Sequence, residues 1–123
     1  MKVLRLDHAQ VTVPSADEAA ARRFYLGVLG LAEIPKPAAL AAHGGFWTAL
    51  GGVQIHIGLE DGVVREQTRA HIAFEVAGIA EWRTRLEKIG MAPKRGSAIV
   101  GLERLELRDP SGNCIELLEK TSV

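Results

Sequence analysis

Apolar and polar residues alternate along two short segments of the chain, and each segment has a histidine near its start. The first segment covers residues 6–13 and the second covers residues 70–76. In both, apolar residues follow the histidine at every second position: Ala9, Val11 and Val13 after His8, and Ile72, Phe74 and Val76 after His71. Because successive side chains of a strand point to opposite faces of a sheet, each segment predicts a strand with one face toward a core. The histidine lies on the other face.

Between and after these strands, the pattern predicts a helix and three further strands in each half of the chain. Ser15 and Glu18 form a capping-box pattern, which predicts a helix that begins there and ends near Leu29. The second helix is expected from Gly78 to Ile89. The remaining strands are expected at residues 31–34, 46–50 and 53–57, and at 91–94, 102–108 and 113–119, with a loop at 35–45 and a linker at 60–68.

The two halves repeat at a nearly constant spacing. Gly30 and Gly90 lie 60 residues apart, as do His56 and Glu116, whereas His8 and His71 lie 63 apart. A period of this length indicates a duplicated supersecondary unit. The predicted fold class is therefore α+β, with two βαβββ modules at about residues 3–60 and 69–120 in a single domain of residues 1–123.

Length, net charge and cysteine content limit the kinds of protein that this chain can be. A chain of 123 residues is long enough for one compact domain with a proper core. Its net charge of zero argues against nucleic acid or an anionic membrane as the main partner. Cys114 is the single cysteine, so no intrachain disulfide is possible. No stretch has the pattern of a signal peptide or of a membrane helix, and a cytoplasmic location is the expectation.

Four residues on predicted strands are candidate metal ligands: His8, His56, His71 and Glu116. All four lie out of phase with the apolar faces of their strands. Imidazole suits Zn, Fe, Ni and Co, and a carboxylate favours a harder ion or a site with bound water. Two histidines and a carboxylate also match the ligand set of non-haem iron enzymes. The alternative is that each histidine is half-buried and bonded to a neighbour, with no metal.

Further polar and aromatic residues are candidates for a substrate pocket. Gln10 and Gln54 flank the histidines and would orient substrate or water, or simply occupy polar positions. Trp47 forms an aromatic wall or belongs to the core. Glu75 shares the predicted face of His71 and is either its hydrogen-bond partner or a solvated, salt-bridged residue. His43 falls in the loop at 35–45, where it is solvated or part of a lid.

Four motifs spread along the chain carry a resemblance to a known family. They are Leu6-Asp7-His8, residues 24–31 (FYLGVLGL), residues 70–74 (AHIAF) and residues 108–117 (RDPSGNCIEL). The chain resembles the vicinal oxygen chelate superfamily, which groups glyoxalases, bleomycin-resistance proteins and extradiol dioxygenases. The resemblance implies that paired modules form a half-open eight-stranded β-cup with a metal ion inside. It also implies that the family's ligand positions fall on His8, His56, His71 and Glu116.

The resemblance implies a glyoxalase-like enzyme in which a divalent ion (Fe, Mn, Ni, Co or Zn) acts as a Lewis acid on a small oxygenated substrate. Glu116 and His56 are the candidate catalytic residues, with Glu116 or a metal-bound hydroxide as the base for proton transfer. Glyoxalase I usually has Glu or Gln where this chain has His56, which argues against methylglyoxal chemistry. The alternatives are an extradiol-type dioxygenase and a protein that binds a small molecule as bleomycin-resistance proteins do. A homodimer is expected.

Overall fold

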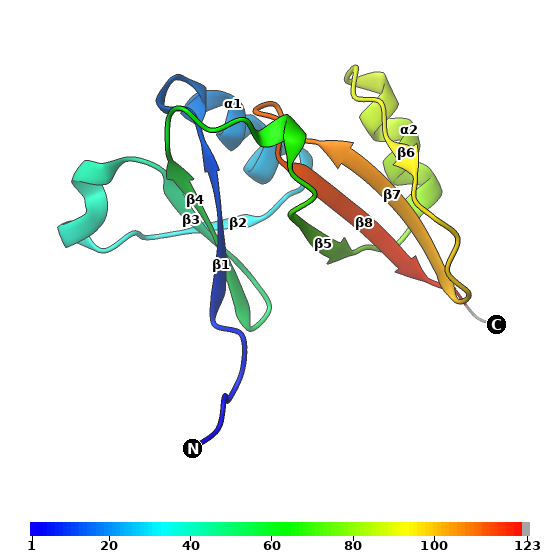
Figure 1. Ribbon diagram of the computed structural model, residues 1–123, viewed down its shortest axis with the longest axis horizontal. Coiled ribbons are helices and arrows are strands. Elements are labelled where there is room, and N and C mark those ends of the chain that lie inside the picture. The colour runs from blue at the N-terminus through cyan, green and yellow to red at the C-terminus, as the bar shows by residue number, and fades with distance from the viewer. Residues whose placement is uncertain (122–123) are drawn as a thin grey trace. The chain divides into compact units, whose positions relative to one another are not determined.

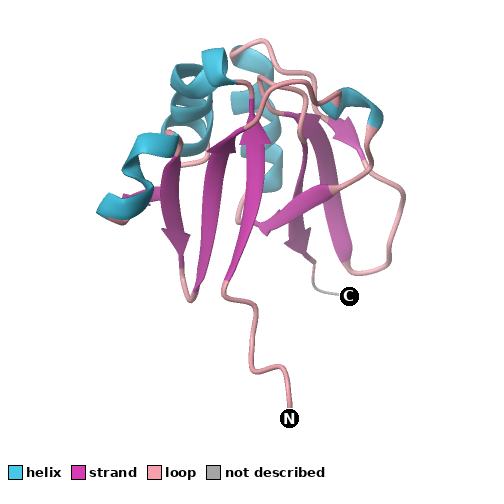
Figure 2. Cartoon of the chain, turned by 60° about the vertical axis from the view of Figure 1, so that its left-hand side comes forward, coloured by secondary structure: helices cyan, strands magenta, loops and turns pink. Residues whose placement is uncertain are grey.

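A computed structural model describes residues 1–121 of the chain, which divides into two compact units. The first unit is Met1–Val63 and the second begins at Val64. Each unit holds one four-stranded sheet, whose strands run side by side (magenta in Figure 2). The strand order is β1-β4-β3-β2 in the first sheet and β5-β8-β7-β6 in the second. The two orders are the same, so the predicted α+β class with a duplicated βαβββ unit is confirmed.

Figure 1 labels the four strands and helix α1 of the first unit. The strands of its sheet are β1 (His8–Val13), β2 (Ala32–Ile34), β3 (Phe46–Leu50) and β4 (Val53–Leu59). Its helical segments are η1 (Ser15–Asp17), α1 (Glu18–Arg22), η2 (Arg23–Val28) and η3 (Ala38–His43).

The second unit repeats this plan. Its strands are β5 (His71–Glu75), β6 (Lys94–Arg95), β7 (Leu102–Arg108) and β8 (Cys114–Lys120), and its helical segments are η4 (Arg65–Gln67) and α2 (Ile79–Lys88). Helix α2 lies along one face of the sheet in Figure 1. No helix within residues 1–121 is long and apolar enough to cross a membrane.

Strand register places the repeat-related residues in equivalent positions. In the first sheet β1 runs parallel to β4, with His8 opposite Gln54 and Gln10 opposite His56. In the second sheet β5 runs parallel to β8, with His71 opposite Cys114 and Ala73 opposite Glu116. His8 and His71 therefore begin equivalent strands, and His56 and Glu116 lie at equivalent points of their neighbours.

One face of each sheet packs into a core, as the alternating pattern predicted. Ile55 and Ile57 of β4 are buried, and Ile115 and Leu117 of β8 are buried in the second sheet. The remaining buried apolar residues of the first unit are Val13, Ala21, Phe24, Tyr25, Leu31 and Phe46, and those of the second are Phe74, Ile79, Leu86, Leu105 and Leu107. His56 and Glu116 are also buried, at 4% and 5% exposure, although they alternate with these core residues along their strands.

The capping box predicted at the first helix is wrong. The Ser15 hydroxyl and its backbone N–H both donate to the Asp61 carboxylate, at 2.8 Å each. The Glu18 carboxylate accepts instead from the backbone N–H of Gly45. A charged acceptor from a distant loop has replaced the local cap, because a charge-assisted hydrogen bond is stronger than a neutral one.

The first helix also changes geometry along its length. It begins as a 3₁₀ turn, continues as α-helix and ends as a π-helical turn, in which Leu29 N–H donates to Phe24 C=O at 2.9 Å. The wider π turn accompanies the burial of two consecutive aromatic side chains, Phe24 and Tyr25, whose rings meet edge to face at 4.9 Å. Gly30 follows at φ +75°, the left-handed position expected for it.

Four further expectations need correction. The loop expected at 35–45 contains the 3₁₀ segment η3, and the linker at 60–68 contains η4 with the buried residue Arg65. The strand expected at 91–94 is only Lys94–Arg95. The second helix was expected to reach Ile89 but ends at Lys88, and Ile89 is 52% exposed.

Gly45 is a position where only glycine fits. Its φ is +79°, and a Cβ built there would lie 2.2 Å from the backbone oxygen of Ile57 on β4. Gly45→Ala is expected to destabilise the protein by about 3 kcal/mol. The cost of the left-handed backbone conformation for alanine adds to the clash of the new Cβ with the backbone oxygen of Ile57. Gly30→Ala is the matched control. Gly30 has a similar φ of +75° with no atom within 4 Å of the added Cβ, so about 1 kcal/mol is expected. Equal urea midpoints for the two variants would contradict this account.

Candidate functional site

His8, at the start of β1, has its ring fixed from one side. Its Nδ1 lies 2.9 Å from the carboxylate Oδ2 of Asp7. A carboxylate only accepts, so Nδ1 carries the hydrogen and Nε2 keeps its lone pair. This carboxylate–histidine arrangement is typical of histidines that bind a metal through Nε2. The same hydrogen bond lowers the pKa of the Asp7 carboxyl.

His71, the repeat-related residue of β5, is fixed in the same way by a different acceptor. Its Nδ1 lies 2.9 Å from the backbone C=O of Arg69, which again only accepts. Its Nε2 lies 3.8 Å from Oε2 of Glu116. The second unit therefore holds Nε2 of His71 close to a carboxylate oxygen of Glu116, and the fold brings these two predicted residues together.

His56 lies between two rings on the face of the first sheet opposite the core. The Trp47 ring stacks on one side of it at 3.8 Å between centroids and 5° between planes. The His8 ring stacks on the other side at 4.3 Å and 15°. The fold thus brings the predicted His8, His56 and Trp47 together, and Trp47 is a wall of this face while Phe46 belongs to the core.

Burial and a polar neighbour define the chemistry of His56. Its Nε2 lies 2.9 Å from Oε1 of Gln54, two residues earlier on the same strand. Desolvation, and to a lesser extent the nearby His8, lowers the pKa of His56 below its ordinary value of 6.5. His56 is therefore a neutral imidazole at neutral pH, the form that binds metals or accepts protons.

The lowered pKa of His56 predicts a specific pH dependence. The unfolded chain takes up a proton near pH 6.5 while the folded chain resists it, so acidification below that value favours unfolding. His56→Gln removes this contribution. The stability lost between about pH 7.5 and pH 5 is expected to be smaller in His56→Gln than in the wild type. Urea unfolding at both pH values measures it, and an equal loss in the two proteins would contradict the assignment.

A hollow of about 510 Å³ opens beside this stack in the first unit. Four of its lining residues were predicted from the sequence as site or pocket residues: His8, Gln10, Trp47 and His56. Lys36, Leu40 and Leu59 also line it, together with His43, which is exposed on η3. The volume suits a small molecule.

Glu75 lies at the other end of β5 from His71. Its carboxylate pairs with Lys120 at 3.7 Å and is 57% exposed. The salt-bridged alternative therefore describes Glu75 in this structure. Within neither unit do three His, Cys, Asp or Glu side chains of residues 1–121 form a metal-binding group. Each unit supplies a pair of candidate ligands.

The sequence interpretation missed Arg104 on β7. Its Nε donates to Oε1 of Glu116, and its side chain is 16% exposed beside a carboxylate that is 7% exposed. The signal that would have found it is alternation: Arg104, Glu106 and Arg108 share one face of the predicted strand at 102–108, next to the strand of Glu116. Asp7 was named from the sequence only as part of the Leu6-Asp7-His8 motif. Its role in orienting the His8 ring was not predicted.

Comparison with known proteins shows where this geometry belongs. A sequence model of the Glyoxalase/Bleomycin resistance protein/Dioxygenase superfamily matches residues 5–117. The chain belongs to this superfamily. A glyoxalase family protein from Bacillus anthracis is 38% identical, with 98% of each chain covered and a TM-score of 0.89. This superfamily membership confirms the resemblance noted from the motifs.

More distant solved structures share the fold. A lactoylglutathione lyase from Agrobacterium tumefaciens is 20% identical, with coverage of 96% of this chain and 95% of that one and a TM-score of 0.73. The fosfomycin resistance protein FosX from Listeria monocytogenes is 21% identical, with coverage of 98% and 94% and a TM-score of 0.78. A search of curated proteins finds no match.

Proposed function

We propose that this protein is a metal-dependent, glyoxalase-like enzyme that transfers a proton on a small oxygenated substrate. The observation that carries the proposal is the matched anchoring of His8 and His71. Each donates Nδ1–H to a neighbouring acceptor at 2.9 Å and keeps the Nε2 lone pair for a ligand. Two repeat-related imidazoles with the same tautomer are expected if both bind one ion.

The donor set fits a divalent transition metal. His8 and His71 would bind through Nε2, and Glu116 would bind through Oε2, which already lies 3.8 Å from His71 Nε2. His56 would be the fourth ligand if Gln54 released its Nε2, or would bind through Nδ1. The proposal requires the half-sites of two units, from one chain or from two, to share the ion. Fe, Mn, Ni, Co and Zn all accept this mixture of imidazole and carboxylate.

The protein's own residues then have distinct tasks. A bound divalent ion would polarise a substrate oxygen and acidify the neighbouring C–H group. Glu116 would accept the proton on Oε2 after that oxygen leaves the ion, while Arg104 holds Oε1 of the buried carboxylate in place. Trp47 would contact the flat face of the substrate, and Gln10, which lines the same hollow, would donate a hydrogen bond to it.

Metal analysis tests the proposal. Protein purified without chelator is expected to contain about one ion per site, and chelator treatment is expected to remove both the ion and any proton-exchange activity, measured as deuterium uptake into substrate. Persistent absence of metal, together with no binding on addition of Mn²⁺, Co²⁺, Ni²⁺ or Zn²⁺, would contradict it.

One observation favours a second function, a metal-free binding protein. Arg104 and Gln54 satisfy Glu116 and His56 with hydrogen bonds from the protein itself. A protein of this kind would bind a flat ligand against Trp47 in the hollow of the first unit. Ligand affinity that is unchanged by a chelator would favour this function, and affinity that falls on chelation would favour the enzyme.

A further inference from the structure

Arg104 treats the two carboxylate oxygens of Glu116 differently. Its Nε donates to Oε1, whereas Oε2 lies 3.8 Å from Nε2 of His71. The carboxylate thus has one oxygen bonded to a guanidinium and the other next to Nε2 of an imidazole. Because a guanidinium is always protonated, a second cation is unfavourable next to Oε1.

The neighbouring loop fixes the guanidinium in this position. Nη1 of Arg104 donates to the backbone C=O of Ser97 at 2.9 Å. Gly96 N–H in turn donates to the backbone C=O of Arg104 at 3.1 Å. A Cβ built on Gly96 would lie 3.1 Å from Nη1 and 3.3 Å from Cβ of Arg104. The side chain of Arg104 therefore has little freedom to leave Glu116.

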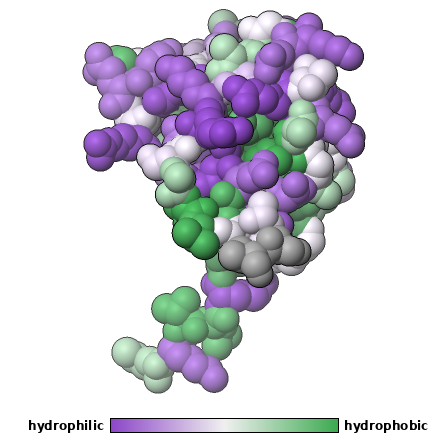
Figure 3. Space-filling model, turned by 90° about the vertical axis from the view of Figure 1, so that its right-hand side faces the viewer, coloured by the Kyte–Doolittle hydropathy of each residue, from purple (hydrophilic) through white to green (hydrophobic). Residues whose placement is uncertain are grey.

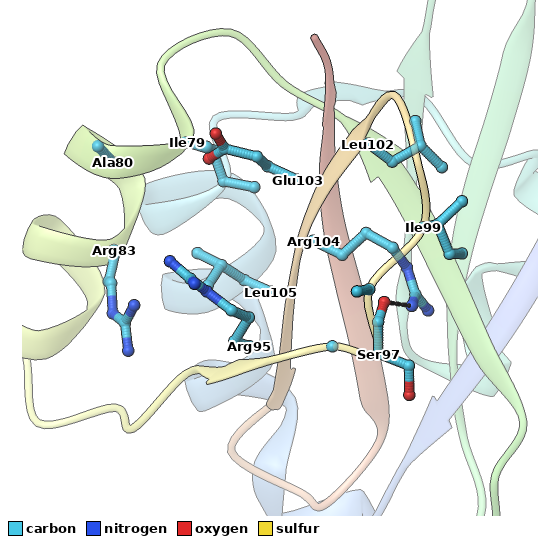
Figure 4. A pocket seen from close by; sticks show the side chains of 12 residues that line it. Ile79, Ala80, Arg83, Arg95, Ser97, Ile99, Leu102, Glu103, Arg104 and Leu105 are labelled. Atoms are coloured by element: carbon cyan, nitrogen blue, oxygen red, sulfur yellow. Dashed lines mark hydrogen bonds between the residues drawn. The ribbon is translucent and has the colours of Figure 1, made fainter. Parts of the chain in front are cut away.

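Arg104 is separated from the other arginines around it. Figure 4 shows its side chain directed toward Ser97, with a dashed hydrogen bond, and away from Arg83 and Arg95. Arg95 pairs with Leu105 in the register of β6 and β7, so it lies on the face of the sheet that α2 covers. Arg95 has the same charge as Arg104 without access to Glu116, which makes it a matched control.

We propose that Arg104 is a positioning residue that occupies Oε1 of Glu116 and leaves Oε2 as the single ligand oxygen beside His71. This inference rests on the proposed function, because it assigns the binding mode of a ligand in that site. Its consequence is that the carboxylate binds a divalent ion through one oxygen. Without Arg104 both oxygens of Glu116 are free, and the carboxylate can rotate or chelate.

Titration of chelator-treated protein with Co²⁺ tests the inference, because the visible absorption of Co²⁺ reports its coordination number as well as its affinity. Arg104→Gln is expected to weaken Co²⁺ binding by about 10- to 100-fold and to change the spectrum toward higher coordination. Arg95→Gln is expected to match the wild type in both. Gly96→Ala keeps the charge but displaces the guanidinium, and is expected to show the same spectral change with a smaller loss of affinity.

The outcomes separate the two proposals. Wild-type affinity, or tighter binding, with an unchanged spectrum in both Arg104→Gln and Gly96→Ala would overturn the positioning role while the metal site stands. If Arg104→Gln does not fold, Gly96→Ala decides, since it leaves the ion pair's charges in place. No Co²⁺ binding by the wild type would overturn the proposed function itself, and this assignment with it.

Discussion

Replacing His8 and His71 together with Ala is expected to abolish metal binding, with an affinity at least about 10³-fold below that of the wild type. Loss of an outer residue that only orients a ligand weakens metal affinity by about 10- to 100-fold, and loss of two ligands exceeds that. Both side chains are about half exposed, at 48% and 45%. Their removal leaves the buried core of each sheet unchanged, so the variant is expected to fold.

The control for this experiment is the fourth histidine of the chain. His43 lies on η3 and is exposed. His43→Ala is expected to bind metal as tightly as the wild type. Calorimetric titration of the chelator-treated proteins measures all three affinities. Retention of metal by His8→Ala/His71→Ala, or equal losses in that variant and in His43→Ala, would exclude the repeat-related pair as ligands.

Glu116→Gln is expected to destabilise the metal-free protein by about 3 kcal/mol. Glutamine has nearly the shape of glutamate but no charge, so the guanidinium of Arg104, 16% exposed, would lose its buried partner and keep only Glu106, whose carboxylate lies 3.8 Å away and is 49% exposed. Breaking a buried ion pair by removing one member leaves an uncompensated charge and costs about 3–5 kcal/mol. The lower end applies because Arg104 also donates to the backbone C=O of Ser97 and lies 3.8 Å from the Glu106 carboxylate.

A double-mutant cycle isolates this pair. Arg104→Gln/Glu116→Gln removes both charges. Its loss of unfolding free energy is expected to be smaller than the sum of the losses in the two single variants, by a coupling energy of about 1–3 kcal/mol. Glu103→Gln, an exposed residue of the same strand, is expected to change stability by less than about 0.5 kcal/mol. Additive urea-unfolding free energies in the cycle would mean that Arg104 and Glu116 do not interact.

Most of the fold could be predicted because local patterns and the repeat agree. β3 and β7 lie where the alternation placed them, since glycine-containing turns bound the strands and the buried residues are two apart, Phe46 and Thr48 in β3 and Leu105 and Leu107 in β7. The repeat spacing of 60 residues appears again in the register, where Gln54 and Cys114 lie opposite the two histidines. Because the alternation and the repeat both indicate the same strands, an error at one position does not change the predicted fold.

The failures came from contacts between residues distant in the sequence. Ser15 has the sequence of an N-cap, but Asp61, 46 residues later, takes its hydrogen bonds. Arg104 was missed because a charged residue on a strand usually faces solvent, and its pairing with Glu116 depends on cross-strand register. The first strand was expected from residue 6 but begins at His8, and the segment before it, at the bottom of Figure 3, leaves Val3, Leu4 and Leu6 exposed.

The central claim is that His8, His71 and Glu116 bind one divalent ion. Anomalous diffraction from crystals of the protein grown with Mn²⁺ or Co²⁺ tests it most directly. The account predicts one anomalous peak per site, about 2.0–2.2 Å from Nε2 of both histidines and from Oε2 of Glu116. A peak at other residues, or no peak at these three side chains at saturating metal, would contradict it.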